Sequence, residues 1–141
     1  MAGDQTQHIH AQVQQAIADQ QSLSITGSGS HEFMLPDHAA DDRIDMTAHS
    51  GIIDYQPTEL TLKARAGTTI IDIQQALAEH RQRLPTDFPM YSFKATLGGA
   101  LAIGHTGSGR PFLGAIRDHI LGASLINGLG HQLNCGGQVM K

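Results

Sequence analysis

The sequence predicts an α+β fold built from short strands, amphipathic helices and glycine-rich turns. Hydrophobic residues make up 40% of the 141 residues, whereas aromatic residues make up only 4% and Trp is absent. The core must therefore consist mainly of aliphatic residues and Ala. Eleven of the sixteen glycines lie from Gly98 onward, so this part of the backbone turns tightly or closely approaches another group. The length fits one ordinary domain, or a large domain that lacks its end.

The first half of the sequence predicts one helix and three short strands. Apolar residues recur at helical spacing over residues 8–20, which predicts an amphipathic helix. The alternation of apolar and polar residues in Leu23–Thr26 predicts a strand that opens into a loop of glycine and serine. Two further short strands are expected at 44–46 and 52–55, with a turn at 49–51 between them.

The middle of the sequence predicts a strand followed by a helix. Apolar residues alternate strictly over residues 60–66 and share one face, at Leu60, Leu62, Ala64 and Ala66. Thr69 is placed to cap a helix that runs to about His80, and Asp72 stands three residues on, as in a capping box. Pro85 and Pro89 exclude its continuation. Residues 120–127 and 131–135 then predict a hairpin that turns at 128–130.

Charge and hydropathy exclude two classes of partner. Nine Lys and Arg against thirteen Asp and Glu give a formal net charge of -4 without a basic run, so we expect no nucleic-acid binding. The apolar stretches are short and the first twenty residues are polar, so neither a membrane span nor a signal peptide is expected. Cytoplasmic localisation follows as the expectation.

Cysteine and histidine carry little signal for a metal centre. Cys135 is the single cysteine, so an internal disulfide is excluded, and we expect a buried, inert thiol in a strand. The nine histidines include His8, His10 and His119, but no cluster of Asp, Glu or Cys stands at ligand spacing. We therefore expect no metal site.

Three segments are candidates for a site, and each has a plain structural alternative. The loop Gly27–His31 follows a strand, and its successive N–H groups suit a phosphate or pyrophosphate, but taken alone it is better explained as a solvent-exposed turn. The segment 95–107 is almost free of large side chains, which suits either a flat ligand or close helix packing. Arg117 and Asp118 precede a strand and are also explained by an ordinary surface ion pair.

The order of these segments resembles that in FAD-binding domains of the para-cresol methylhydroxylase and vanillyl-alcohol oxidase type. Among these, it is most similar to the FAD-binding subunit of bacterial glycolate oxidases. The resemblance runs from about residue 10 to Lys141. It rests on the Gly27–Ser30 loop, the strand pattern at 60–67 that follows Gly51, Ala95-Thr96-Leu97-Gly98-Gly99, and Ile116-Arg117-Asp118 with Leu121-Gly122.

The resemblance implies a set of FAD-binding residues. It divides the chain into a pyrophosphate-binding lobe, about 1–66, and a partial flavin-facing lobe, 67–141. The pyrophosphate would lie against Gly27, Ser28, Gly29, Ser30 and His31. The flavin side would be lined by Pro85, Thr86, Thr96, Leu97, Gly98, Gly99 and Ala100, continued by Gly104 and Gly107, with Arg117, Asp118, Leu121 and Gly122 leading away from the pocket.

Two departures from the family pattern refine these expectations. Some relatives attach the flavin covalently through a histidine after Gly-Ser-Gly, but that position is Ser30 here and His31 comes one place later, so we expect noncovalent FAD. Residues 136–141 continue in complete relatives into further FAD contacts and a domain that covers the substrate. We therefore expect this fold to be incomplete at its C-terminal end, and no catalytic residue can be assigned.

The function implied is the FAD-binding portion of a glycolate or other 2-hydroxy-acid oxidase subunit, in which hydride passes to the flavin. The resemblance also implies partner subunits, a second flavoprotein and an iron-sulfur protein, with the inner face of the membrane reached through them. Two alternatives remain open: an assembly module without flavin, and a flavin oxidase for another hydroxy acid or alcohol.

Overall fold

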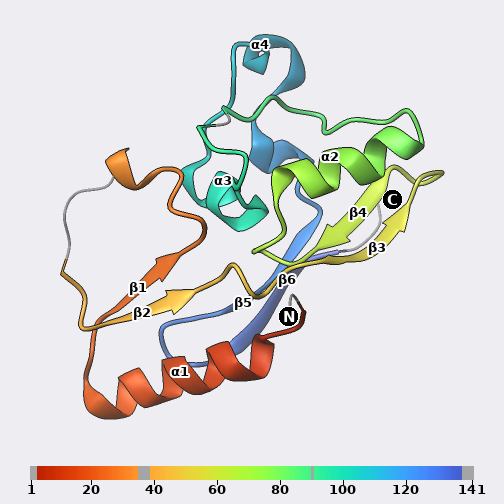
Figure 1. The fold of residues 1–141 in the computed structure, drawn as a ribbon. Helices are drawn as coiled ribbons and strands as arrows, with labels where there is room; N and C mark the ends of the chain where they lie inside the picture. The colour runs from red at the N-terminus through yellow and green to blue at the C-terminus, as the bar shows by residue number, and fades with distance from the viewer. Residues whose placement is uncertain (1–2, 35–38, 90, 138–141) are drawn as a thin grey trace.

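The computed structural model describes residues 3–34, 39–89 and 91–137, and it confirms the α+β class (Figure 1). The helices are α1 (Thr6–Asp19), α2 (Ile70–Glu79), α3 (Leu97–Ile103) and α4 (Arg110–Leu113), with 3-10 turns at Glu32–Met34 and Ile116–His119. The strands are β1 (Leu23–Thr26), β2 (Asp42–Asp45), β3 (Ile52–Gln56), β4 (Thr61–Ala64), β5 (Gly122–Ile126) and β6 (Gln132–Gly136).

The strands form three two-stranded sheets. β1 and β2 are parallel, with Ile25 opposite Ile44, whereas β3–β4 and β5–β6 are antiparallel pairs. Because β1 and β2 run in the same direction, the loops that follow them leave from the same edge. In Figure 1, α3 lies between this edge and α2.

The main apolar cluster joins the two ends of the described chain. Ile9 and Val13 of α1 pack with Ile44 of β2, and the cluster is completed by the partly buried Leu23, Met46 and Ile126. The His10 ring also forms a 2.9 Å hydrogen bond with the Gly130 carbonyl oxygen in the hairpin turn. The hairpin β5–β6 therefore covers a core built by the first fifty residues. The division into lobes at residue 66 stays a prediction.

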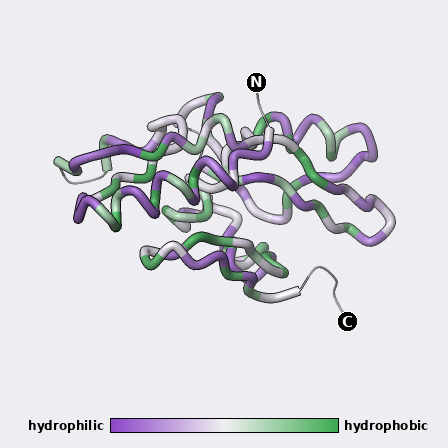
Figure 2. Tube along the Cα trace, turned by 90° about the horizontal axis from the view of Figure 1, so that it is seen from below, coloured by the Kyte–Doolittle hydropathy of each residue, from purple (hydrophilic) through white to green (hydrophobic). Residues whose placement is uncertain are grey.

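The hydrophobic residues are distributed in short stretches along the chain, as Figure 2 shows. Among the described residues, no helix is long and apolar enough to cross a membrane. The apolar residues instead form narrow faces. On α2 the buried face is Ile70, Ile73 and Leu77, which is the periodicity that predicted this helix.

The cap of α2 is formed as the sequence predicted. The Thr69 hydroxyl accepts a 3.1 Å hydrogen bond from the Asp72 N–H, so one of the free amides in the first turn is satisfied. The end of the helix is tied to the preceding turn, because the Gln82 side chain donates to the Pro57 carbonyl and accepts from the Tyr55 hydroxyl.

Two expectations about burial and strand length were wrong. The strand predicted from residue 60 begins at Thr61, because the turn that Pro57 opens extends to Leu60, which has φ of 56° and is 70% exposed. Leu60 therefore does not share the face of Leu62. Cys135 was expected to be buried but is exposed, since every residue of β6 faces solvent in this structure.

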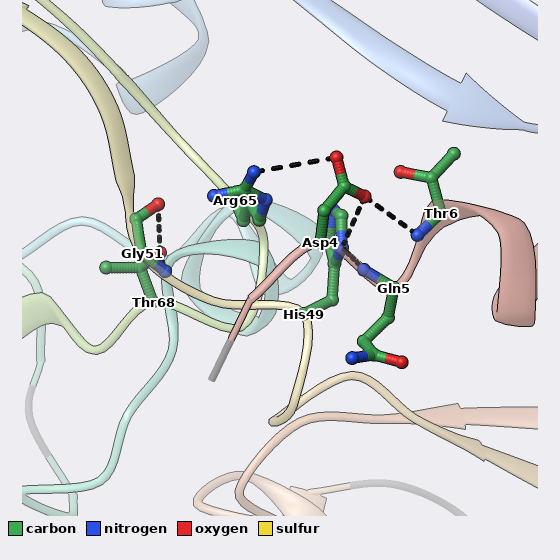
Figure 3. Close-up of polar contacts among 7 residues, drawn as sticks. All are labelled: Asp4, Gln5, Thr6, His49, Gly51, Arg65 and Thr68. Atoms are coloured by element: carbon green, nitrogen blue, oxygen red, sulfur yellow. Dashed lines mark hydrogen bonds and ion pairs between the residues drawn. The ribbon is translucent and has the colours of Figure 1, made fainter. Parts of the chain in front are cut away.

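Thr68 joins three segments that are distant in sequence. It is 2% exposed, and its hydroxyl both donates to the Gly51 carbonyl (3.2 Å) and accepts from the Gly51 N–H (2.9 Å), as Figure 3 shows in part. Its own carbonyl accepts from the Leu97 N–H at 2.8 Å. The residues before α2 are thus fixed to the β3 side and to the start of α3.

Replacing Thr68 with Val should destabilise the fold by about 1–3 kcal/mol, because it leaves the Gly51 N–H without its partner while preserving side-chain shape. The Gly51 carbonyl loses the Thr68 hydroxyl but keeps the Arg65 N–H. Urea unfolding followed by circular dichroism measures the change. Thr58→Val, at an exposed turn position, is the matched control. Equal midpoints for the two variants would contradict the role given to Thr68.

A polar cluster fixes the N-terminal segment to the same region (Figure 3). The Asp4 carboxylate lies 3.5 Å from the Arg65 guanidinium and 3.9 Å from His49 Nδ1. The Gln5 N–H donates to His49 Nδ1 at 3.0 Å, which requires this nitrogen to be unprotonated. Hydrogen bonds from the Thr6 hydroxyl and N–H, with a smaller contribution from Arg65, lower the pKa of Asp4 from 3.8 to about 2.

This cluster predicts two pH windows for stability. Burial, together with Arg65 and against the opposing effect of Asp4, lowers the pKa of His49 below its ordinary value of 6.5. The stability due to neutral His49 should be present above pH 6.5 and be lost as the pH falls towards its folded value. The contribution of Asp4 should be present above pH 3.8 and be lost as the pH falls to about 2.

Urea midpoints measured across this range for the natural chain and for His49→Gln test the first window. The difference between the two proteins should shrink as the pH falls below 6.5. A difference that is independent of pH would show that protonation of His49 does not disturb the cluster.

Candidate functional site

The loop that follows β1 presents unpaired donors. No described residue accepts a hydrogen bond from the N–H groups of residues 27–31. Gly29 has φ of +73°, a left-handed conformation that glycine adopts without strain. The Ser28 Oγ is buried and has no hydrogen-bond partner among the described residues. A buried hydroxyl next to free amides is expected to have a ligand as its partner.

This loop lies directly against the residue that precedes α3. A Cβ on Gly27 would come within 2.5 Å of Thr96 Oγ1, so the contact exists only because residue 27 has no side chain. Thr96 is 4% exposed, and its Oγ1 accepts from the Gly99 N–H at 3.3 Å. The structure therefore brings together the two regions that the sequence singled out, the Gly27–His31 loop and the small-residue segment.

An open cleft of about 490 Å³ runs along this contact. Its lining is mainly polar and comes from the edge of β1–β2, the start of α2 and the segment before α3. The residues are Gly27, Ser28, Arg43, Asp45, Thr47, Ser50, Gly67, Thr69, Asp72, Lys94 and Thr96. The volume is in the range of pockets for small molecules and cofactors.

A second, much smaller cavity of about 10 Å³ is mainly apolar. It is lined by His31, Ile70, Phe88, Pro89, Ala95, Ala100, Ile103 and His105. His31 is 8% exposed, shares a 3.0 Å hydrogen bond with the Ser30 hydroxyl and packs edge-on against Tyr91. The end of the loop and the inner face of α3 are thus also in contact.

Within the small-residue segment, Gly98 serves close packing. A Cβ on Gly98 would lie 2.8 Å from the Ala66 Cβ, and its N–H donates to the Ala66 carbonyl at 2.7 Å. Gly104 ends α3 with φ of 67°. At these positions the helix-packing interpretation of the segment holds, while Thr96, at the start of α3, lines the cleft.

The predicted residues beyond α2 divide into buried and exposed ones. Thr86 is 6% exposed, and its Oγ1 has no partner among the described residues. Pro85 is exposed. Gly107 donates to the Asp87 carbonyl at 2.8 Å, and a Cβ there would come within 2.9 Å of the Asp87 side chain. Gly107 therefore holds the 85–88 segment against the loop that follows α3.

The last group of predicted residues lines neither cavity. Arg117 and Asp118 form an ion pair of 3.7 Å, with side chains 85% and 57% exposed, so the surface-pair interpretation describes them in this structure. Leu121 precedes β5. Gly122 pairs with Gly136, and a Cβ on it would clash with the Cys135 and Gly137 carbonyls. Gly122 is thus required by the hairpin itself.

Sequence analysis missed the charged residues of the cleft. Arg43 and Asp45 are two apart on β2 and so project from the same face. Lys94 is two residues before Thr96, in a turn closed by a hydrogen bond from the Ala95 N–H to the Ser92 carbonyl. The alternation in Asp42–Asp45 was a usable signal for the first pair, but an isolated lysine has no pattern that marks it.

The carboxylate and the guanidinium of β2 are both held in place. The N–H and side chain of Thr47, and more weakly Arg43, lower the pKa of Asp45, so this carboxylate is ionised at neutral pH. Arg43 Nε donates to the Thr26 hydroxyl at 2.7 Å, and the guanidinium lies 3.7 Å from Glu32. Lys94 has no ion-pair partner among the described residues. Residues 3–34, 39–89 and 91–137 contain no group of three or more His, Cys, Asp or Glu side chains that could hold a metal ion.

These features define an FAD-binding domain, and comparison with known proteins agrees. The chain belongs to the family described as the FAD binding domain, whose model matches residues 2–136, and FAD is therefore its cofactor. The free amides of the loop, the unpaired Ser28 hydroxyl and the side-chain-free positions fit a dinucleotide with a diphosphate bridge.

The chain is similar to the glycolate oxidase subunit GlcE of Escherichia coli (strain K12). The two are 43% identical over 138 residues, which cover 98% of this chain and 39% of that protein. The chain thus spans about two fifths of the length of this relative.

Solved structures with the same fold include a protein with glucose dehydrogenase activity and an oxidase, by their titles. Phl p 4, a grass pollen allergen with glucose dehydrogenase activity, superposes with a TM-score of 0.76 at 15% identity, over 95% of this chain and 28% of that one. The 6-hydroxy-D-nicotine oxidase of Arthrobacter nicotinovorans gives 0.71 at 21% identity, over 90% and 27%. At these identities the likeness shows the fold alone.

Replacing Gly29 with Val should remove FAD binding while leaving the chain folded. The φ of +73° is strained for a β-branched residue, and the new side chain would enter the space beside Glu32, 2.9 Å away. Flavin fluorescence titration measures the affinity, and circular dichroism verifies the fold. A folded variant with the affinity of the natural chain would show that the loop does not contact the cofactor.

Proposed function

We propose that this chain is the FAD-binding portion of a subunit of a 2-hydroxy-acid oxidase or dehydrogenase that acts on glycolate or a closely related acid. The observation that carries the proposal is the 43% identity to the glycolate oxidase subunit across 98% of this chain. The loop with free amides next to Thr96 supplies the physical basis for holding the cofactor.

In this proposal the diphosphate of FAD lies at residues 27–31. The amides and the Ser28 hydroxyl would donate to its oxygens, since all of them lack partners among the described residues. Thr86, with a buried unpaired hydroxyl, and residues 96–100 would line the flavin side. Pro85, Gly104 and Gly107 would shape the same wall, with Arg117, Asp118, Leu121 and Gly122 at its far end.

FAD is proposed to be noncovalent, because the residue after Gly-Ser-Gly is Ser30. The imidazole of His31, one place later, is buried and bonded to the Ser30 hydroxyl through Nδ1. When bound, FAD supplies a hydride acceptor for the α-carbon of the hydroxy acid. This chain's own residues bind and orient the cofactor, and the small side chains of 95–107 leave room for a planar ring.

The relative's name as a subunit supports the proposal that this chain has partner subunits. We propose a complex with a second flavoprotein subunit and an iron-sulfur subunit, located in the cytoplasm or at the inner face of the membrane through those partners. The small 2-hydroxy acid is the substrate of the whole assembly, and this chain contributes the cofactor.

A second candidate is an assembly module that carries no flavin. The exposed β6 strand and the half-exposed Leu125 and Leu133 favour a surface that another segment or subunit covers. The visible spectrum of the purified chain distinguishes the two candidates, because only a chain that carries flavin absorbs there.

Purification from a flavin-replete source should give a yellow protein with a flavin spectrum. Acid precipitation should release all of the flavin into the supernatant, since no covalent bond holds it. In the complete subunit, glycolate added without oxygen should bleach the spectrum, and D-lactate and a sugar alcohol serve as the comparison substrates. A colourless chain that rejects added FAD would contradict the proposal and favour the assembly module.

A further inference from the structure

The large cleft carries two basic side chains that the family comparison does not assign. Arg43 comes from β2, and Lys94 from the turn before α3. Both line the same space as Gly27 and Ser28. The cleft therefore combines fixed positive charge with the free hydroxyl and amides of the loop.

The position of Arg43 is fixed by a hydrogen bond to Thr26, the residue directly before the loop. Its Nε donates to the hydroxyl of Thr26, the last residue of β1, at 2.7 Å, so the guanidinium lies next to the point where the chain enters the loop. The contact with Glu32, at 3.7 Å between side chains more than half exposed, is of the kind that contributes little free energy. It leaves further N–H donors of the guanidinium available to a ligand.

The cleft also contains two carboxylates, Asp45 and Asp72, so its two charges of each sign cancel. A bare anion would therefore gain little from the cleft as a whole. A nucleotide is different, since it joins an anionic phosphate to a ribose whose hydroxyls donate to carboxylates. The volume of about 490 Å³ suits a group of that size.

We propose that Arg43 and Lys94 bind the phosphates of the ADP half of FAD, opposite the amides of residues 27–31, with the ribose towards Asp45. This inference rests on the proposed function only in taking FAD as the ligand. It adds that two charged side chains outside the glycine and serine loop determine much of the affinity. Two cations facing a diphosphate neutralise its charge, and the bonds they form are the stronger, charge-assisted kind.

The test is titration of the flavin-free chain with ADP and with FAD by isothermal calorimetry. The variants are Lys94→Ala, Arg43→Ala and Lys94→Arg. Lys63→Ala, which removes an exposed lysine of β4 that lines neither cavity, is the matched control for net charge. Circular dichroism and urea unfolding verify each fold.

Each of the Lys94→Ala and Arg43→Ala variants should raise the Kd for ADP and for FAD about tenfold. Lys94→Arg should retain most of the affinity, and Lys63→Ala should match the natural chain. The natural chain should also lose ADP affinity as NaCl rises, and Lys94→Ala should lose less. If Arg43→Ala fails to fold, because it loses the bond to Thr26, the Lys94 variants decide the outcome.

Unchanged Kd values in folded Lys94→Ala would overturn the inference, as would equal weakening by Lys63→Ala or a natural chain that does not bind ADP. The proposed function fails on other results, which are the absence of FAD binding or the absence of bleaching by glycolate and its analogues. A chain that binds ADP through Lys94 but belongs to an oxidase of another substrate would keep the inference and lose the proposed function.

Discussion

The hydroxyl of Thr68 connects the β3–β4 sheet to the segment that begins α2. It bonds in both directions with Gly51, while the carbonyl of the same residue holds the Leu97 N–H. Two neighbouring hydrogen bonds join the same segments. The Gly67 N–H donates to the His49 carbonyl, and the Gly98 N–H donates to the Ala66 carbonyl. Within the described residues, none of these sheets has a third strand. The relative placement of β3–β4, α2 and α3 therefore depends on these hydrogen bonds more than on sheet pairing.

The hydrogen bonds around Thr68 also determine where the Gly27–His31 loop can lie. Thr96 is fixed through its neighbour Leu97, and the Gly27–His31 loop then rests on Thr96 at a distance that only glycine permits. Glycine at these positions is therefore a packing requirement as well as a means of exposing amides. The segment that begins at Thr96 thus both packs closely, at Gly98, and borders the cleft, at Thr96.

Local patterns in the sequence predicted the elements but not what covers them. The strand at Leu23–Thr26 and the turn at 128–130 were recognisable because alternation and glycine act over a few residues. Leu60 was assigned wrongly because the turn begun by Pro57 overrides the alternation. The exposure of Cys135 and the position of Lys94 in the cleft depend on which distant segments lie nearby, so no local pattern could indicate them. The loop was found from its glycines, whereas the charges around it were not.

The packing of Ile126 onto α1 has a consequence for how the protein is made. The His10 ring and the Gly130 carbonyl that meet there are 120 positions apart, and synthesis proceeds at about 5–20 residues per second. Ile9 and Val13 are therefore synthesised several seconds before the hairpin that packs against them. During that interval the nascent chain exposes an apolar helix face, which is the kind of surface that chaperones bind.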